Sequence, residues 1–138
     1  MEGFKKFDAA SFTTPRSVGI RRGKATEGFN IVNCPFGMRI VLAKEMVGKC
    51  EIIDTCEISF DENRIAIGRR NIPNGQTFYP RPWGKKLAIY SAGLVKEVTE
   101  KYDLDFSGKT SLTFHDIDYE INEVDDSIIA IVTINKIS

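Results

Sequence analysis

The chain has 138 residues, with 19 basic and 19 acidic side chains and a formal net charge of zero. This length fits one domain, or two intertwined half-domains, and is sufficient for a hydrophobic core. The apolar fraction of 42% is ordinary for a globular protein, and the longest apolar runs have only the length of a strand. We therefore expect no membrane association, and because the N-terminus does not resemble a signal peptide, a cytoplasmic protein is the default.

Charge is divided unevenly along the chain. Residues 1–99 contain 16 Lys and Arg against 10 Asp and Glu, a balance of +6, and residues 100–138 contain 3 against 9, a balance of −6. Such asymmetry indicates either a molecule with one basic face or halves of an oligomer that attract each other. Two solvated surfaces are an equally good explanation.

The first half of the chain contains an N-terminal arm, residues 1–15, and a first structural unit, residues 16–70. In the arm, phenylalanines in a polar background indicate either disorder or a strap that docks on the core. Val18 and Ile20 alternate with small or polar residues and predict a strand, followed by a loop at 23–28. The rest of the unit is expected to form strands at 29–32 and 38–42, a short helix at 43–48, and a hairpin of strands 56–60 and 64–68.

Residues 71–85 are expected to connect this unit to a second one. The connector contains three prolines, two glycines and the only tryptophan, so it should be extended and stiff, with a turn at Asn74-Gly75. We interpret Phe78, Tyr79 and Trp83 as a clamp that seals the two units together, because large aromatic side chains are usually buried. The alternative is that they form an exposed binding surface.

The second unit, residues 86–138, repeats the order of the first. A strand at 87–90 precedes a helix with Ser91 at its N-cap, along which apolar residues recur at helical spacing. Further strands are expected at 111–114, 118–121 and 127–132, the last two joined by an acidic turn. Strands outweigh helices, so the predicted fold is α+β with mainly antiparallel β structure, in which two tandem strand-helix-hairpin units share one core.

This order resembles the AbrB-type swapped-hairpin module of bacterial regulators and antitoxins, which includes SpoVT-like proteins. The resemblance lies in the short helix at 42–47 and the hairpin at 57–67, and it covers residues 16–70 and, more loosely, 86–134. Two copies in one chain are similar to the MraZ-type tandem arrangement. The resemblance implies an intertwined swapped-hairpin β-barrel, often formed by a homodimer, in which basic residues on exposed strands and loops contact double-stranded DNA.

Basic residues in the first unit and around the connector are the candidates for DNA contacts. Their cationic groups neutralise phosphates, and arginine can also read guanine. Basic pairs at strand ends also serve simply to keep sheet edges soluble, and this explanation carries equal weight. The acidic second unit repels phosphates, so we expect nucleic acid at the first. The candidates are Arg16, Arg21, Arg22, Lys24, Arg39, Arg69, Arg70, Arg81, Lys85 and Lys86.

No catalytic constellation or cofactor motif is recognisable. Three cysteines without a Cys-x-x-Cys pair, and His115 as the only histidine, give too few ligands for a zinc site. We expect Cys34, Cys50 and Cys56 to be buried, reduced thiols, and His115 to mark the polar end of a strand. The paired acids occur where turns need polar residues, so we predict a protein that is not an enzyme and needs no cofactor or metal.

Two functions remain open. The first is a small transcriptional regulator of the AbrB-like type. The second is an accessory protein of a phage or mobile element, which binds and inhibits a host protein through an acidic surface that mimics nucleic-acid charge. That surface would consist of Asp116, Asp118, Glu120, Glu123, Asp125 and Asp126.

Overall fold

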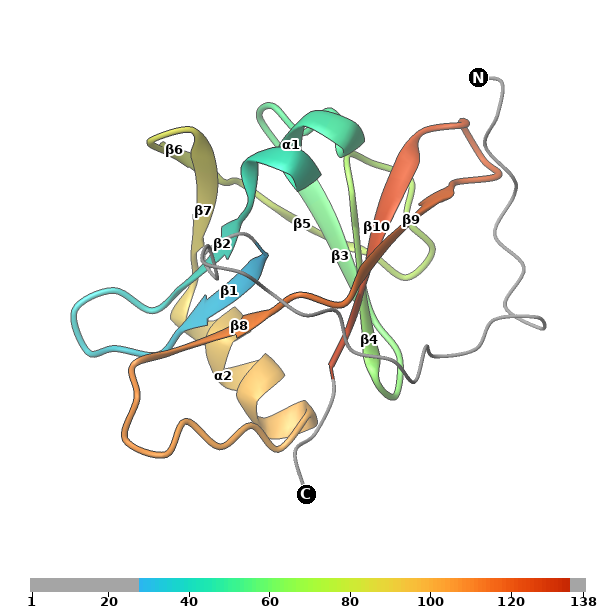
Figure 1. Cartoon of the computed structure of the whole chain (residues 1–138). Coiled ribbons are helices and arrows are strands. Elements are labelled where there is room, and N and C mark those ends of the chain that lie inside the picture. The colour runs from blue at the N-terminus through green and yellow to red at the C-terminus, as the bar shows by residue number, and fades with distance from the viewer. Residues whose placement is uncertain (1–27, 135–138) are drawn as a thin grey trace.

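The computed structural model describes residues 28–134, and the expected arm and the strand predicted at 16–22 lie outside this range. Ten strands and two helices follow one another in the described part (Figure 1). Their bounds are β1 Phe29–Val32, β2 Arg39–Leu42, α1 Lys44–Cys50, β3 Cys56–Phe60, β4 Arg64–Gly68, β5 Gln76–Phe78, β6 Arg81–Trp83, β7 Lys86–Tyr90, α2 Ala92–Lys101, β8 Ser111–Phe114, β9 Ile117–Ile121 and β10 Ile128–Thr133.

The strands form two antiparallel sheets of five. Sheet 1 has the order β6-β7-β2-β1-β8, and sheet 2 has the order β5-β3-β4-β10-β9. The mainly antiparallel α+β fold is thus confirmed. Each sheet ends in two edge strands, so the described residues do not form one closed barrel. Pro82 suits the edge strand β6, because proline has no N–H to donate to a further strand.

Each sheet combines one hairpin from either half of the chain. In sheet 1 the hairpin β1–β2 joins β6–β7 through the antiparallel pair β2 and β7, with Val41 opposite Ala88. In sheet 2 the hairpin β3–β4 joins β9–β10 through β4 and β10, with Ala66 opposite Ile131. Neither half of the chain therefore completes a sheet alone.

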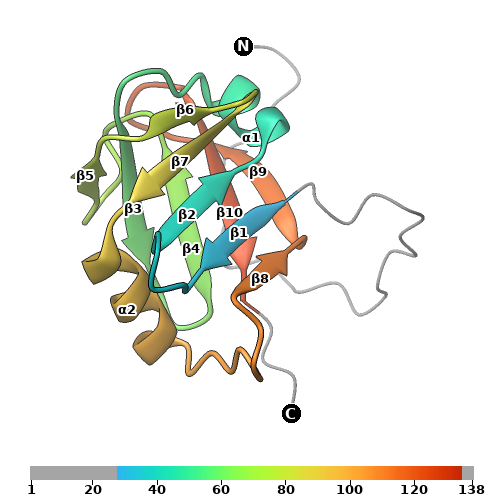
Figure 2. The same ribbon diagram turned by 90° about the vertical axis from the view of Figure 1, so that its left-hand side faces the viewer.

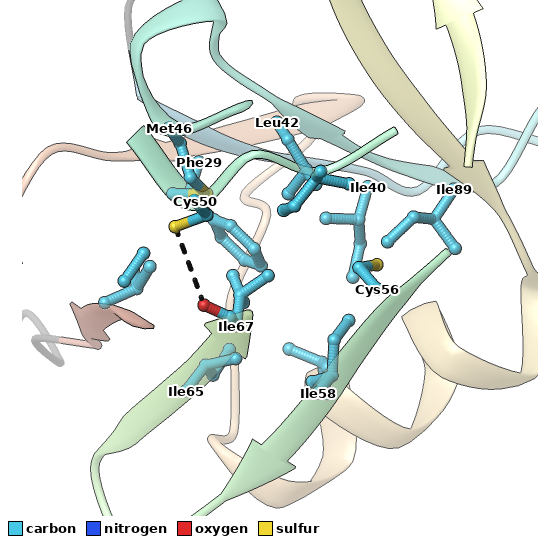
Figure 3. Close-up of a cluster of buried hydrophobic side chains, with 14 of the residues drawn as sticks. Phe29, Ile40, Leu42, Met46, Cys50, Cys56, Ile58, Ile65, Ile67 and Ile89 are labelled. Atoms are coloured by element: carbon cyan, nitrogen blue, oxygen red, sulfur yellow. Dashed lines mark hydrogen bonds between the residues drawn. The ribbon is translucent and has the colours of Figure 1, made fainter. Parts of the chain in front are cut away.

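The core lies between the sheets and is closed by the helices. It includes Phe29 and Ile40 from sheet 1, and Ile65 and Ile67 from sheet 2, none of which is exposed (Figure 3). The two helices lie at opposite ends of the paired sheets (Figures 1 and 2). As predicted, Ser91 is the N-cap of α2, and its hydroxyl oxygen accepts a hydrogen bond from the Leu94 amide at 3.1 Å.

A buried tyrosine ties α2 to sheet 2. The hydroxyl of Tyr102, the C-cap residue of α2, donates to the backbone carbonyls of Asp61 and Arg64, at 2.9 and 2.8 Å. Its ring packs edge-to-face against Phe60 on β3. These hydrogen bonds fix the end of the helix against the turn between β3 and β4. Burial of the side chain raises the pKa of Tyr102.

The segment predicted as a connector is extended, as expected, with a turn closed by the hydrogen bond from the Gly75 amide to the Ile72 carbonyl. It also supplies β5 to sheet 2 and β6 to sheet 1, which the sequence did not indicate. The aromatic clamp is wrong in part, since Phe78 packs against the core but Tyr79 is 73% exposed and Trp83 44% exposed. Both exposed rings belong to or adjoin an edge strand, where a side chain on the outer face has no second layer to cover it.

The cysteines also differ from one another. Cys50 and Cys56 are buried as expected, and burial raises the pKa of each thiol to about 12. Cys34 is only half-buried, because it follows β1 on the way to the exposed turn before β2. None of the three forms a disulfide in the structure.

Candidate nucleic-acid interface

The outer face of sheet 1 gathers cationic and aromatic side chains from three neighbouring strands. Successive residues of a strand point to opposite faces, and on β2 the side chains of Ile40 and Leu42 enter the core. Arg39 must therefore lie on the outer face. The pairing register places Tyr90 opposite Arg39, and Lys86 opposite Trp83, on that same face.

Sheet 1 carries positive charge only. Arg39, Arg81 and Lys86 are the only charged residues in its five strands, and none of these strands contains Asp or Glu. The strands of sheet 2 instead contain one cation, Arg64, and three carboxylates, Glu57, Asp118 and Glu120. The strands of the two sheets therefore carry charge of opposite sign, although each sheet takes strands from both halves of the chain.

Two of the cations lie close to the ring of Trp83. The guanidinium carbon of Arg39 is 5.4 Å from the centre of the indole ring, and Nζ of Lys86 is 5.9 Å from it. Both distances are within the range of a cation–π attraction. The cations come from the two central strands and the tryptophan from the edge strand, so these contacts draw three strands into one surface.

Arg39 is also restrained at its other side. One terminal nitrogen donates to the carbonyl oxygen of Gly37 at 2.9 Å, while its Nε is buried and has no hydrogen-bond partner among the described residues. A buried donor without a partner is costly, and its burial keeps this nitrogen away from a ligand on the surface. The guanidinium is held in place by the Gly37 carbonyl and the indole ring.

Small apolar residues form the floor of this surface. Val32, Val41 and Ala88 lie on the outer face of sheet 1 yet are at most 9% exposed, and Cys34 packs against them. Neither helix covers this face, which is turned toward the viewer in Figure 2. The long side chains that share the face with these residues are therefore expected to lie over them, which makes a flat platform.

The turn between β6 and β7 extends the cationic surface. Gly84 has φ +64°, in the left-handed region that glycine adopts readily, and no other atoms would crowd a Cβ there. Lys85 is exposed beside it. Together, Arg39, Arg81, Trp83, Lys85, Lys86 and Tyr90 make up what we call the basic-aromatic face.

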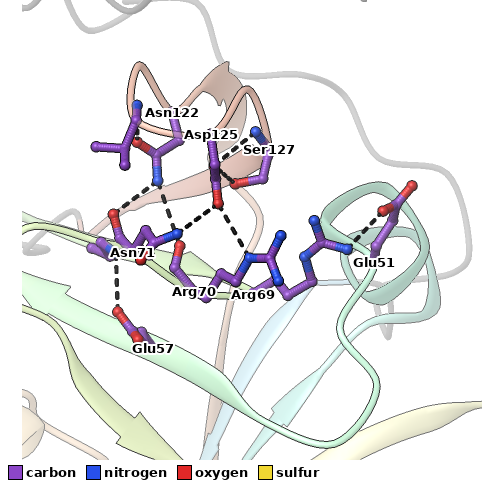
Figure 4. Close-up of polar contacts among 10 residues, drawn as sticks. Glu51, Glu57, Arg69, Arg70, Asn71, Asn122, Asp125 and Ser127 are labelled. Atoms are coloured by element: carbon purple, nitrogen blue, oxygen red, sulfur yellow. Dashed lines mark hydrogen bonds and ion pairs between the residues drawn. The ribbon is translucent and has the colours of Figure 1, made fainter.

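Two predicted candidates lie elsewhere and have acidic partners. Arg69 contacts Glu51 at 3.2 Å, and Nε of Arg70 contacts Asp125 at 3.4 Å (Figure 4). Asp125 also accepts a hydrogen bond from the side chain of Asn71 at 3.0 Å. Arg70 therefore helps to join the loop after β4 to the turn between β9 and β10, and Arg69 joins that loop to the end of α1. Four further candidates, Arg16, Arg21, Arg22 and Lys24, lie outside the described residues.

The predicted acidic surface is divided in two. Asp116, Asp118 and Glu120 alternate along β9 and the residue before it. Burial, together with the neighbouring carboxylates, raises the pKa of Asp118 and raises that of Glu120 to about 7. Asp125 is held in the turn by Ser127 and Asn71, and its pKa is well below the ordinary value because of these hydrogen bonds. Glu123 and Asp126 are exposed at that turn.

The structure adds little to support another chemistry. Among residues 28–134, no three His, Cys, Asp or Glu side chains gather in a way that could hold a metal ion. His115 is exposed just after β8. Neither helix in this part of the chain has the length and hydropathy needed to span a membrane.

Tyr90 is the member of the basic-aromatic face that the sequence did not indicate. It ends an apolar strand and resembles an ordinary boundary residue. Only the register, which sets it opposite Arg39, brings it to the face.

Comparison of the chain with protein-family models, curated proteins and solved structures gave no match. Function is therefore inferred from the chain's own geometry.

Proposed function

We propose that this protein is a small non-enzymatic regulator that binds nucleic acid through the basic-aromatic face. One observation carries the proposal: every charged residue in the strands of sheet 1 is a cation, and these cations share a face that neither helix covers. Lys and Arg that neutralise phosphates release counterions, which is the main source of affinity for nucleic acid. An AbrB-like regulator implies double-stranded DNA as the partner. It also implies a location in the cytoplasm.

The pairing of hairpins supports an AbrB-like role as a proposal. Each sheet takes one hairpin from each half of the chain, as two interlocked copies of a swapped-hairpin module would. We propose that the two sheets are an open form of that arrangement, in which one chain supplies both copies. The hairpin β6–β7 is then the element best placed to contact DNA, because a two-stranded ribbon fits the major groove.

Salt dependence of binding tests this proposal. The affinity for a labelled 20-base-pair duplex, measured by fluorescence anisotropy, should fall linearly with salt on a log-log plot. The double variant Arg81→Ala and Lys85→Ala should lower that slope by up to about 2, since each phosphate contact contributes about 0.9. The control is Lys96→Ala with Lys101→Ala on α2, which should leave the slope unchanged. Absence of binding at low salt, to duplex or single strand, would refute the proposal.

A second candidate function rests on β9. Burial, and then repulsion from a neighbouring carboxylate, raises the pKa of Asp118 and of Glu120, and a basic partner protein would relieve that repulsion. This favours the inhibitor of a host protein, encoded by a phage or mobile element. Capture of a host protein from lysate should slow when these three residues become Asn or Gln. Equal capture by the native and neutralised proteins, at the same rate and salt dependence, would exclude it.

A further inference from the structure

We infer that the basic-aromatic face binds single-stranded nucleic acid more tightly than the duplex considered above, with one unpaired base stacked on the indole of Trp83. The inference rests on the proposed function and adds the class of ligand. It starts from the exposure of the aromatic rings: Trp83 is 44% exposed and Tyr90 50% exposed, although the protein has a well-filled core between its sheets. Single exposed rings are ordinary on a protein surface, so the inference depends on the cations that accompany these two rings.

The charges around the rings identify the ligand as a polyanion. Each exposed ring lies across the strand pairing from a cation, Trp83 opposite Lys86 and Tyr90 opposite Arg39. No carboxylate occurs in any strand of the sheet. Cations beside aromatic rings on an open groove or sheet are the combination that holds single strands, because the phosphates meet the cations while bases stack on the rings.

The same geometry favours unpaired over paired bases. In a duplex both faces of each base are covered by its neighbours, so an indole on a flat sheet finds no base face to stack against. Trp83 pairs with Lys86, and Lys86 is four residues from Tyr90 on β7, which corresponds to about 13 Å along the strand. The rings of Trp83 and Tyr90 therefore offer separate stacking positions along one extended strand of nucleic acid.

Arg39 helps to hold the stacking ring and to meet the ligand. Its guanidinium is fixed by the Gly37 carbonyl and lies 5.4 Å from the centre of the indole ring. A phosphate above the platform can meet the positive charge of this guanidinium while the base lies on the indole.

Trp83 is the only tryptophan, so its fluorescence reports stacking directly. The full chain is titrated with a 12-nucleotide oligothymidine and with a blunt 12-base-pair duplex. We expect the single strand to quench the fluorescence and to bind about tenfold more tightly than the duplex, the size of effect that one stacked base provides. Equal quenching by both forms, or tighter binding of the duplex, would overturn the inference.

A variant separates stacking from support of the hairpin. In anisotropy measurements with labelled oligonucleotides, Trp83→Leu should weaken binding of the single strand about tenfold and leave duplex binding within twofold, whereas Trp83→Phe should keep most of the affinity. Equal losses for both ligands would mean that Trp83 only supports β6, which overturns the inference but leaves the proposed function standing. If the native protein binds neither ligand, the proposed function itself fails.

Discussion

The outer faces of the two sheets have the same architecture and opposite chemistry. Each is built around an antiparallel pair of strands from different halves of the chain, with small or aliphatic residues at the centre: Val41 and Ala88 in sheet 1, Ala66 and Ile131 in sheet 2. Around the first pair every charged residue is a cation and two aromatic rings are exposed, and beside the second lie Asp118 and Glu120. Because alternate residues of a strand face opposite ways, the core can remain the same while the outer faces diverge.

The comparison shows which charges are available for binding. On sheet 1, the guanidinium of Arg39 contacts an aromatic ring and a backbone carbonyl rather than a carboxylate. At the end of sheet 2, Arg69 and Arg70 face Glu51 and Asp125. A count of basic residues treats these three arginines alike, whereas the acidic partners of Arg69 and Arg70 make Arg39 the better candidate for phosphate contacts.

Separating the halves of the chain should have the largest effect. A fragment of residues 16–70 lacks β7 and β10, the central partners of β2 and β4, so the apolar faces of both its hairpins would be exposed. We expect it to be unfolded or to associate. Chemical-shift dispersion in an NMR spectrum and the mass in solution check this. A well-dispersed, monomeric fragment would contradict the interdependence of the two halves.

Breaking the polar link at the end of sheet 2 should have the next largest effect. Asp125→Asn weakens the contacts with Arg70 and Ser127 and should lower the free energy of unfolding at pH 7 by about 1–2 kcal/mol, the value of charge-assisted hydrogen bonds. The pKa of Asp125 is lowered in the folded state, so its contribution is complete at neutral pH and declines as the pH falls below 3.8.

Urea unfolding at pH 7 and pH 3 measures this difference. Asp126→Asn is the matched control, because Asp126 is the exposed neighbour and asparagine tolerates its φ of 62°. The control should change stability little at either pH. A pH-independent loss in Asp125→Asn would show that the carboxylate charge is not what stabilises the turn.

Neutralising the outer face of sheet 2 should have a smaller effect of opposite sign. Burial, and then the Asp118 carboxylate, raises the pKa of Glu120 from 4.5 to about 7, and one of its oxygens is buried without a hydrogen-bond partner among the described residues. Ionised Glu120 therefore opposes folding increasingly as the pH rises from 4.5 through 7. Glu120→Gln should stabilise the protein at pH 8 by at most about 1 kcal/mol, allowing for solvent screening.

The same variant should have no such advantage at pH 4, where the carboxyl is protonated in the folded protein. Thermal unfolding at both pH values measures this. Glu123→Gln, at the exposed turn beyond β9, is the control and should change stability little at either pH. An equal gain at pH 4 and pH 8 in Glu120→Gln would show that packing, rather than charge, explains the effect.

Local elements could be predicted from the sequence because their signals are local. The Ser91 side chain caps α2, as its residue type and position predict. The strands at 29–32, 56–60, 64–68 and 111–114 have the bounds that the sequence predicts. The pairing of β2 with β7 and of β4 with β10 could not be read from the sequence, because many apolar strands could pair equally well.

The candidate site was predictable in composition but not in arrangement. Arg81, Lys85 and Lys86 stand close together in the sequence, yet the addition of Arg39 depends on the register between β2 and β7. Arg70 meets Asp125 across 55 residues of sequence, which no local pattern indicates. The exposure of Trp83 depends on its position in an edge strand, and the tendency of tryptophan to be buried suggested the opposite.

Chemical-shift mapping tests most directly which sheet binds nucleic acid. Amide resonances of the ¹⁵N-labelled protein are followed as the 12-nucleotide oligothymidine is added at low salt. We predict that the largest shifts fall on β2, β6 and β7, with Trp83 and Lys85 among them, while β9 and β10 change little. Shifts concentrated on β9 and β10, or no shifts at any concentration, would contradict the assignment of nucleic-acid binding to the basic-aromatic face.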